Sequence, residues 1–296
     1  MLDYGNIKFV VATTPKLIQG VHRLRYQVYV EEFHFEKPED HPHGLEQDEW
    51  DPMSLHMAAV DPEENVVGTI RLVLNSPHGL PTLHAVNPFY QDPHPASPRI
   101  AEVSRLAVAR HFRRRVEDGF KGVEDLAAEA PGARVARSEE GGLNSQERRR
   151  QFAVILGLFK IMYHVSKRIN LADWYMVSEK RLWYLLKRYH ILFHPVGPEM
   201  EYHGVRIPYL GHISEIESHM LKVNQSLAES FIEGLDSPTL EGKTTCTVPP
   251  TDIKPREVFE SIPDIVWPYR ISNPATAETA APPALPPASD WGLDVS

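Results

Sequence analysis

Apolar residues along the first thirty positions recur with two different periods. A short apolar run at 7–12 predicts a β-strand. Thr14 before Pro15 is a typical helix start, because a hydroxyl can cap the helix and proline suits its first turn. Apolar residues then recur every three or four positions to about Val30, the pattern of an amphipathic helix. The chain is therefore expected to begin with a strand and a helix.

A polar segment separates this helix from three predicted strands. Residues 31–50 lack a regular period and predict an ordered loop, of the kind that often carries binding groups. The apolar runs at 55–60 and 66–74 are joined by a turn sequence, which predicts a β-hairpin. After a connection rich in proline and histidine, residues 100–108 alternate like a half-buried strand.

Regular patterns return after a low-complexity segment at 113–150, which we predict to be an insertion. Residues 152–169 have apolar positions at helical spacing and predict a buried helix, and 174–177 predicts a short strand. The remaining predicted elements are a helix, two strands and a last helix, at 182–189, 192–196, 205–210 and 213–232. The strand–helix–strand order in mid-chain implies one parallel pair of strands.

The predicted fold class is α/β in the α+β sense, with a mixed, mainly antiparallel sheet flanked by helices. The regular elements fall within residues 1–235, which we expect to form one domain around the insertion. Residues 236–296 are rich in proline and have no period, so they predict a largely extended or disordered tail.

Composition limits the class of protein and its location. The 296 residues are 42% hydrophobic and 24% charged, with a formal net charge of -9, which fits a globular protein and gives no reason to expect nucleic-acid binding. The single cysteine, Cys246, excludes an internal disulfide and fits a reducing compartment. The N-terminus has no signal-peptide pattern, and the most apolar run is too short and charged to span a bilayer. We expect a cytoplasmic protein without an integral membrane segment.

Charged residues interrupt the strand predicted at 100–108. Glu102 and Ser104 should face one side of the sheet and Arg105 the other, because side chains alternate along a strand. Glu102 and Arg105 can share one site only if the strand bulges or separates from a neighbour, and both occur often beside active sites. The alternative is an edge strand with one solvated face.

Further charged residues lie on the neighbouring elements. Arg25 is one residue from the apolar face of the first helix, where an arginine usually extends to water, and Arg71 interrupts the second hairpin strand. The acids of the motif Glu46-x-Asp48-x-x-Asp51 could bind a cation or an amine, or could form a solvated turn.

In order and spacing, these motifs resemble the acyl-homoserine-lactone synthase branch of the GNAT superfamily and the related N-acyl amino acid synthases. The closest resemblance is to acyltransferases associated with PEP-CTERM/exosortase systems. The matching segments are 24–36, Glu46-x-Asp48-x-x-Asp51, 68–72 and 102–106. The resemblance implies a GNAT-type acyl-CoA N-acyltransferase fold for residues 1–235.

The resemblance also implies a charged cluster on the amine-substrate side of the site. Asp48 and Asp51 would bind the substrate ammonium, and Arg71 or Arg105 a substrate carboxylate. Synthases that use S-adenosylmethionine usually carry a tryptophan in the region that here contains Phe33. The implied substrate-binding residues are Arg25, Phe33, Asp48, Asp51, Arg71, Ser104 and Arg105.

Amide formation needs an amine that has lost its proton, a nearby thioester and donors for the developing oxyanion. Glu102 is the predicted catalytic base, and the alternative for Glu102 is a structural ion pair with Arg105 or Arg71. His56, on the neighbouring strand, is a rival base, and its alternative is a satisfied core histidine.

The donor side departs from CoA-dependent relatives. Those carry a glycine-containing pyrophosphate loop, whereas residues 110–115 of this chain are Arg-His-Phe-Arg-Arg-Arg, which suits a donor held on a carrier protein. Carrier proteins are acidic, so two basic clusters could dock one, although solvated surface arginines are the alternative. The clusters comprise Arg113, Arg114, Arg115, Arg148, Arg149 and Arg150.

The predicted function is transfer of a fatty acyl group from acyl carrier protein, or from acyl-CoA, to the amine of an amino acid or related small molecule. One alternative is an acyl-homoserine-lactone synthase that uses S-adenosylmethionine, and another is a non-catalytic acyl-binding or regulatory module. The acyl thioester is a co-substrate, and no cofactor is expected. The scattered histidines show no metal-ligand spacing, so no metal is expected.

Overall fold

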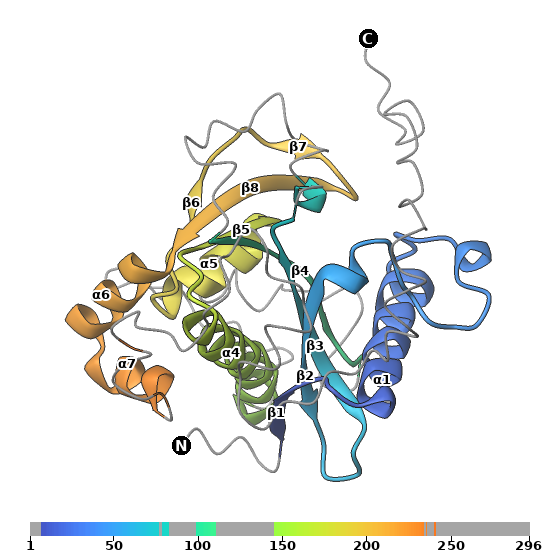
Figure 1. Ribbon diagram of the computed structural model, residues 1–296, viewed down its shortest axis with the longest axis horizontal. Coiled ribbons are helices and arrows are strands. Elements are labelled where there is room, and N and C mark those ends of the chain that lie inside the picture. The colour runs from blue at the N-terminus through green and yellow to red at the C-terminus, as the bar shows by residue number, and fades with distance from the viewer. Residues whose placement is uncertain are drawn as a thin grey trace, which may run out of the picture.

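A computed structural model describes residues 7–76, 79–82, 99–110, 145–233, 235 and 240, with the backbone alone for 145–153 (Figure 1). The strands are β1 (Lys8–Val11), β2 (Ser54–Val60), β3 (Val66–Leu74), β4 (Ile100–Val108), β5 (Asp173–Ser178), β6 (His194–Pro195), β7 (Met200–Glu201) and β8 (Val205–His212). The α-helices are α1 (Pro15–Arg25), α4 (Ser145–Arg168), α5 (Lys180–Arg188), α6 (Ile213–Val223) and α7 (Gln225–Ile232).

The strands form one eight-stranded sheet in the order β1-β2-β3-β4-β5-β8-β6, with β7 beside β8. Neighbouring strands are antiparallel except for the parallel pair β4–β5, which confirms the predicted mixed, mainly antiparallel sheet. β4 and β5 pair only from Ile100, opposite Asp173, to Glu102, opposite Tyr175. Beyond Glu102 the two strands therefore separate.

β4 also bulges. Thr69 of β3 pairs with Ala107, whereas Arg71 pairs with Ser104, so β4 has one residue more than β3 in this stretch. At the bulge Arg105 has a backbone φ of 50°, in the left-handed region that residues other than glycine rarely adopt. Both conditions under which the charges of β4 could share a site are thus met, because the strand bulges and also leaves β5.

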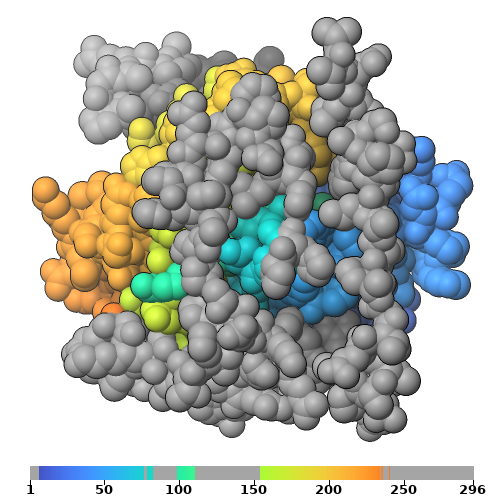
Figure 2. Space-filling model, turned by 45° about the horizontal axis from the view of Figure 1, so that its top comes forward, coloured from blue at the N-terminus to red at the C-terminus, as the bar shows by residue number. Residues whose placement is uncertain are grey.

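Helices cover both faces of the sheet (Figure 1). Val21 of α1 and Ala58 of β2 share one buried cluster. On the other face a Cβ added at Gly68 would lie 2.6 Å from Val154 Cγ1 of α4 and 3.2 Å from Ala59 Cβ, so α4 approaches the sheet closely there. The α6–α7 pair, in orange, lies at the opposite end of the molecule from α1 and the loop that follows it, in blue (Figures 1 and 2).

The first helix changes geometry before it ends. Thr14 caps α1 by accepting a hydrogen bond from a backbone N–H at 3.3 Å, as predicted. α1 stops at Arg25, and the chain continues as the π-helix η1 (Tyr26–Glu32), so the predicted helix is not a single α-helix. Segments of π-helix are rare and often lie at functional sites. The following loop contains two 3₁₀ turns, η2 (Pro38–Asp40) and η3 (Asp51–Met53).

Two predictions for the C-terminal elements were wrong in detail. The segment 213–232 is two helices, because the backbone breaks at Asn224, with φ −154° and ψ 79°. The Asn224 side chain caps α7 by accepting from Leu227 N at 3.1 Å. The strand predicted at 192–196 is shorter, with His194 and Pro195 in register with β8.

The predicted insertion at 113–150 and the predicted tail at 236–296 lie almost entirely outside the described residues and stay predictions. Within the described ranges, no helix combines the length and the apolar character needed to cross a membrane.

The close approach of α4 to β3 gives a stability test. We expect Gly68→Ala to lower the free energy of unfolding by about 1–3 kcal/mol, because its Cβ would collide with the stiff Val154 side chain. Val154→Ala removes the colliding methyl groups, so the double variant should lose less stability in urea unfolding than the sum of the single variants. Additive losses would contradict this packing.

Candidate active site

Charged side chains from α1, the following loop, β3 and β4 meet around Asp51. Its Oδ1 accepts hydrogen bonds from Arg25 Nη1 at 2.7 Å and Arg71 Nη1 at 2.8 Å. Its Oδ2 accepts from Arg25 Nη2 at 3.2 Å and from the backbone N–H of Asp48 at 2.9 Å. Burial alone would raise the pKa of Asp51, but the charges of Arg25 and Arg71 outweigh burial and hold that pKa well below its ordinary range.

Glu46 links two of the arginines. Arg25 Nε donates to Glu46 Oε2, and Arg105 Nε donates to Glu46 Oε1 at 3.1 Å. Burial would raise the pKa of Glu46, but the charges of Arg105 and Arg25 lower it. Glu46 was predicted only as one of three acids that could bind a cation or an amine, and it was not among the implied substrate-binding residues. Its spacing from Asp48 was the available signal.

Asp48 links Arg71 to Arg105. Arg71 Nη1 donates to Asp48 Oδ1 at 2.5 Å, and Arg105 Nη2 lies 3.1 Å from Asp48 Oδ2. Arg71 Nε also donates to Ser104 Oγ at 3.0 Å. One connected network therefore contains most of the predicted substrate-binding residues, namely Arg25, Asp48, Asp51, Arg71, Ser104 and Arg105.

The network has a buried side and an open side. The side chains of Arg25 and Arg71 are 0% and 2% exposed, whereas Arg105 is 20% and Asp48 16% exposed. Glu36, 30% exposed, lies 3.3 Å from Arg105 Nη2 and was not predicted from the sequence. Burial raises the pKa of Glu36, and Arg105 offsets this only in part. A ligand would therefore meet Arg105, Asp48 and Glu36, which we call the rim.

A row of aromatic rings begins at the rim. The Arg105 Cζ atom lies 5.4 Å from the centroid of the Tyr29 ring, and the Tyr29 hydroxyl donates to Leu106 O at 2.9 Å. The Tyr29 ring is 6.3 Å from Phe35, which stacks on Phe33 at 5.3 Å. The rings of Tyr29 and Phe35 therefore lie between Phe33 and Arg105. Tyr29 was missed by sequence reasoning, although it follows Arg25 at helical spacing.

Glu102 lies on the same face of β4 as Ser104 but is held differently. Its Oε2 accepts hydrogen bonds from the backbone N–H of Thr82 at 2.9 Å and from Thr82 Oγ1 at 2.6 Å. Within the described part of the chain it forms no ion pair with Arg71 or Arg105. Burial raises the pKa of Glu102 to about 7, and Thr82 and the two arginines lower it only in part. Glu102 can thus gain or lose a proton near neutral pH.

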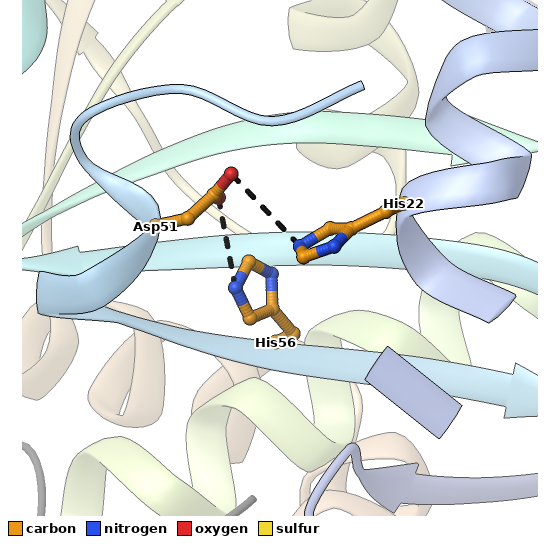
Figure 3. A group of neighbouring side chains, drawn as sticks. All are labelled: His22, Asp51 and His56. Atoms are coloured by element: carbon orange, nitrogen blue, oxygen red, sulfur yellow. Dashed lines mark ion pairs between the residues drawn. The ribbon is translucent and has the colours of Figure 1, made fainter. Parts of the chain in front are cut away.

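Two buried histidines lie beside Asp51 (Figure 3). His56 Nε2 is 3.6 Å from Asp51 Oδ1 and His22 Nε2 is 3.9 Å from Asp51 Oδ2, both too long for hydrogen bonds. Burial, reinforced by the charge of Arg25, lowers the pKa of His56 to about 3 and that of His22 to about 4. His56 is only 1% exposed and is a weak base, which does not favour its rival catalytic role.

The ligand atoms of His22, Asp51 and His56 lie within 4.8 Å of one another, close enough by distance alone to hold a metal ion. Each Asp51 oxygen, however, already accepts two hydrogen bonds, three of the four from guanidinium groups. A divalent cation would have to displace these donors and would lie beside the charges of Arg25 and Arg71. The donor set fits a hydrogen-bonded carboxylate better than a metal centre.

The predicted carrier-docking clusters cannot be placed in the same way. Arg113, Arg114 and Arg115 lie outside the described residues, and for Arg148–Arg150 only the α4 backbone is described. Their role stays a prediction.

Comparison with known proteins bears on the fold and the domain. Residues 24–118 match the family described as an acetyltransferase (GNAT) domain, and no curated protein sequence matches the chain. The structure of TofI in a ternary complex with an inhibitor and MTA has a TM-score of 0.51 at 14% identity, over 74% of this chain and 95% of TofI. The AHL synthase LasI has a TM-score of 0.50 at 14% identity, over 74% of this chain and 95% of LasI. FeeM, an N-acyl amino acid synthase from uncultured soil microbes, has a TM-score of 0.46 at 13% identity, over 73% of this chain and 96% of FeeM.

Residues 24–118 thus resemble a GNAT acetyltransferase domain, which is consistent with the predicted acyltransferase. The similarity to TofI and LasI confirms the predicted GNAT-like fold. At these identities the similarity concerns the fold and does not extend to a donor or an acceptor.

The shared carboxylate of Asp51 gives a second stability test. We expect Asp51→Asn to lower the free energy of unfolding by about 3–5 kcal/mol, because it leaves two buried guanidinium groups short of a counter-charge. The matched control Glu36→Gln removes a carboxylate at the rim and should cost less than about 1 kcal/mol. Similar losses for both variants in chemical unfolding would contradict the division into a buried and an open side.

Proposed function

We propose that this protein is an N-acyltransferase that moves a fatty acyl group from a carrier-protein or CoA thioester to the amine of an amino acid or related small molecule. The observation that carries the proposal is Glu102, a buried acid with a pKa of about 7 at the point where β4 leaves β5. The charged network reaches the same face of β4, where Ser104, two residues from Glu102, accepts a hydrogen bond from Arg71.

Glu102 suits the proton transfer that amide formation requires. An α-amine titrates near pH 8 and arrives mainly as ammonium, so a base with a pKa near neutrality can remove its proton. The amine nitrogen then attacks the thioester carbonyl carbon, forming the C–N bond, and the nitrogen releases its second proton to water. Collapse of the intermediate breaks the C–S bond, and the proton held by Glu102 passes to the leaving thiolate. Past Glu102, the edge of β4 that no longer pairs with β5 would offer backbone groups to the acyl substrate.

Burial divides the predicted substrate-binding residues into two roles. Asp48 and Arg105 are at the rim and would contact the acceptor ammonium and carboxylate. Arg25, Arg71 and Asp51 are buried behind them and would hold the rim residues in place.

A lactone-forming synthase is the second candidate, favoured by one observation. Arg105 at the rim has three carboxylates around it, from Glu36, Glu46 and Asp48, so the rim suits an acceptor with net positive charge. S-adenosylmethionine is such an acceptor. The departure at Phe33-His34-Phe35 weighs against it.

Product analysis tests the function directly. The purified protein should convert acyl carrier protein thioester and an amine acceptor into an N-acyl product, identified by mass spectrometry as a linear amide or, for the second candidate, a lactone. Glu102→Gln should lower turnover by roughly 10²–10⁴-fold, since it cannot accept the proton. Urea unfolding of the variant would show that the fold is intact.

Near-normal turnover of Glu102→Gln would remove Glu102 from the role of base. If the unmodified protein forms no N-acyl product with carrier-bound and CoA donors across a panel of amines, the enzyme proposal fails, and a non-catalytic acyl-binding module takes its place.

The carrier protein is the partner that the basic clusters favour. If Arg148–Arg150 attract an acidic carrier, the KM for acyl carrier protein should rise as salt increases from about 0.05 to 0.5 M, because salt screens exposed charges. An uncharged acyl-pantetheine donor is the control and should show little change. Replacing the three arginines by glutamine should flatten the salt dependence, and a KM that ignores salt would count against docking at this cluster.

Two further expectations stay predictions. The link to PEP-CTERM/exosortase systems rests on the sequence resemblance alone, and the cytoplasmic location rests on sequence composition.

A further inference from the structure

The segment that follows β3 returns over the sheet and is held there by a buried leucine. Gly79, with a φ of 80°, turns the chain, and its N–H donates to a carbonyl oxygen at 2.8 Å. Leu80 is fully buried in a cluster with Val73 and Tyr175. These contacts fix the backbone at Leu80, two residues before Thr82, and so place Thr82 over the sheet.

Thr82 directs both of its donors at one oxygen of Glu102. The backbone N–H lies 2.9 Å and Oγ1 lies 2.6 Å from Oε2, and residues Thr82 and Glu102 are 7% and 1% exposed. A backbone N–H can only donate, so Oε2 acts as an acceptor here. With both lone pairs of Oε2 engaged, Oε1 is the oxygen that remains for a proton.

We propose that Thr82 is a positioning residue for the catalytic base, holding Oε2 of Glu102 so that Oε1 is presented to the amine. The inference rests on the proposed function, in which Glu102 takes up the amine proton. Thr82 acts through Glu102 and does not itself touch the reacting atoms.

The same contacts adjust the basicity of Glu102. A carboxyl group buried without donors stays protonated at neutral pH, and a protonated acid cannot act as a base. Hydrogen bonds to the ionised form oppose this effect of burial. Thr82 thus keeps part of Glu102 ionised at the pH where an amine must be deprotonated.

The pH profile of kcat/KM for the amine tests the proposal. The rate should rise with pH as Glu102 ionises. Thr82→Val removes one of the two donors, so the pKa of Glu102 should rise and the midpoint of the ascending limb should move up by about one pH unit. At pH 7 this corresponds to a fall in kcat/KM of about fivefold, from the smaller ionised fraction alone. Thr82→Ser keeps a hydroxyl and should restore the original midpoint.

Thr69→Val is the matched control. Thr69 is buried on β3, and its hydroxyl donates to Met57 O at 2.9 Å, away from Glu102, so this variant can lose stability without moving the midpoint. If Thr82→Val does not fold, Thr82→Ala removes the same hydroxyl and should give the same shift.

A midpoint that stays unchanged in the folded Thr82 variant, or moves equally in Thr69→Val, overturns the proposal. The outcome is separable from that of the proposed function. An active Glu102→Gln variant would overturn the role of Glu102 itself. An inactive Glu102→Gln variant together with an unmoved midpoint in Thr82→Val would overturn only the role of Thr82.

Discussion

The carboxylate of Asp51, shared between Arg25 and Arg71, is the interaction on which the candidate site depends. It joins α1 to β3 across the interior, where neither guanidinium could be buried without a counter-charge. The loop between η1 and β2 must therefore fold back over the sheet to deliver its acids. Once Asp51 is in place, Glu46 and Asp48 from the same loop extend the pairing to Arg105, and the network is exposed to solvent at the rim.

Glu102 is set apart from this network by the same geometry. The arginines are occupied by the loop acids, so Glu102 is buried with Thr82 as its partner and its pKa rises to about 7. One face of the sheet thus holds two kinds of acid, those held ionised by arginine and one that can exchange a proton. This difference allows one site to bind a charged acceptor and also to deprotonate it.

The elements and charged motifs were predictable because their signals are local, such as the cap at Thr14. The burial of each charged side chain was not predictable, because it depends on how the loop folds over the sheet. Asp48 and Asp51 are three residues apart, yet one reaches the rim and the other is buried. Thr82 gave no signal, since it lies in an aperiodic connection twenty positions before its partner. The helix break at Asn224 was not predicted, because a polar residue on an exposed face leaves the apolar period intact.

The two kinds of acid are distinguished most directly by titrating the Glu102 carboxyl group in the folded protein, followed by ¹³C NMR. The signal can be assigned by its loss in Glu102→Gln. We expect a midpoint near pH 7, because burial outweighs the hydrogen bonds from Thr82 and the charges of the arginines. A midpoint at or below that of an ordinary glutamate, about 4.3, would contradict it, because Glu102 would then be one more ion-paired acid of the network.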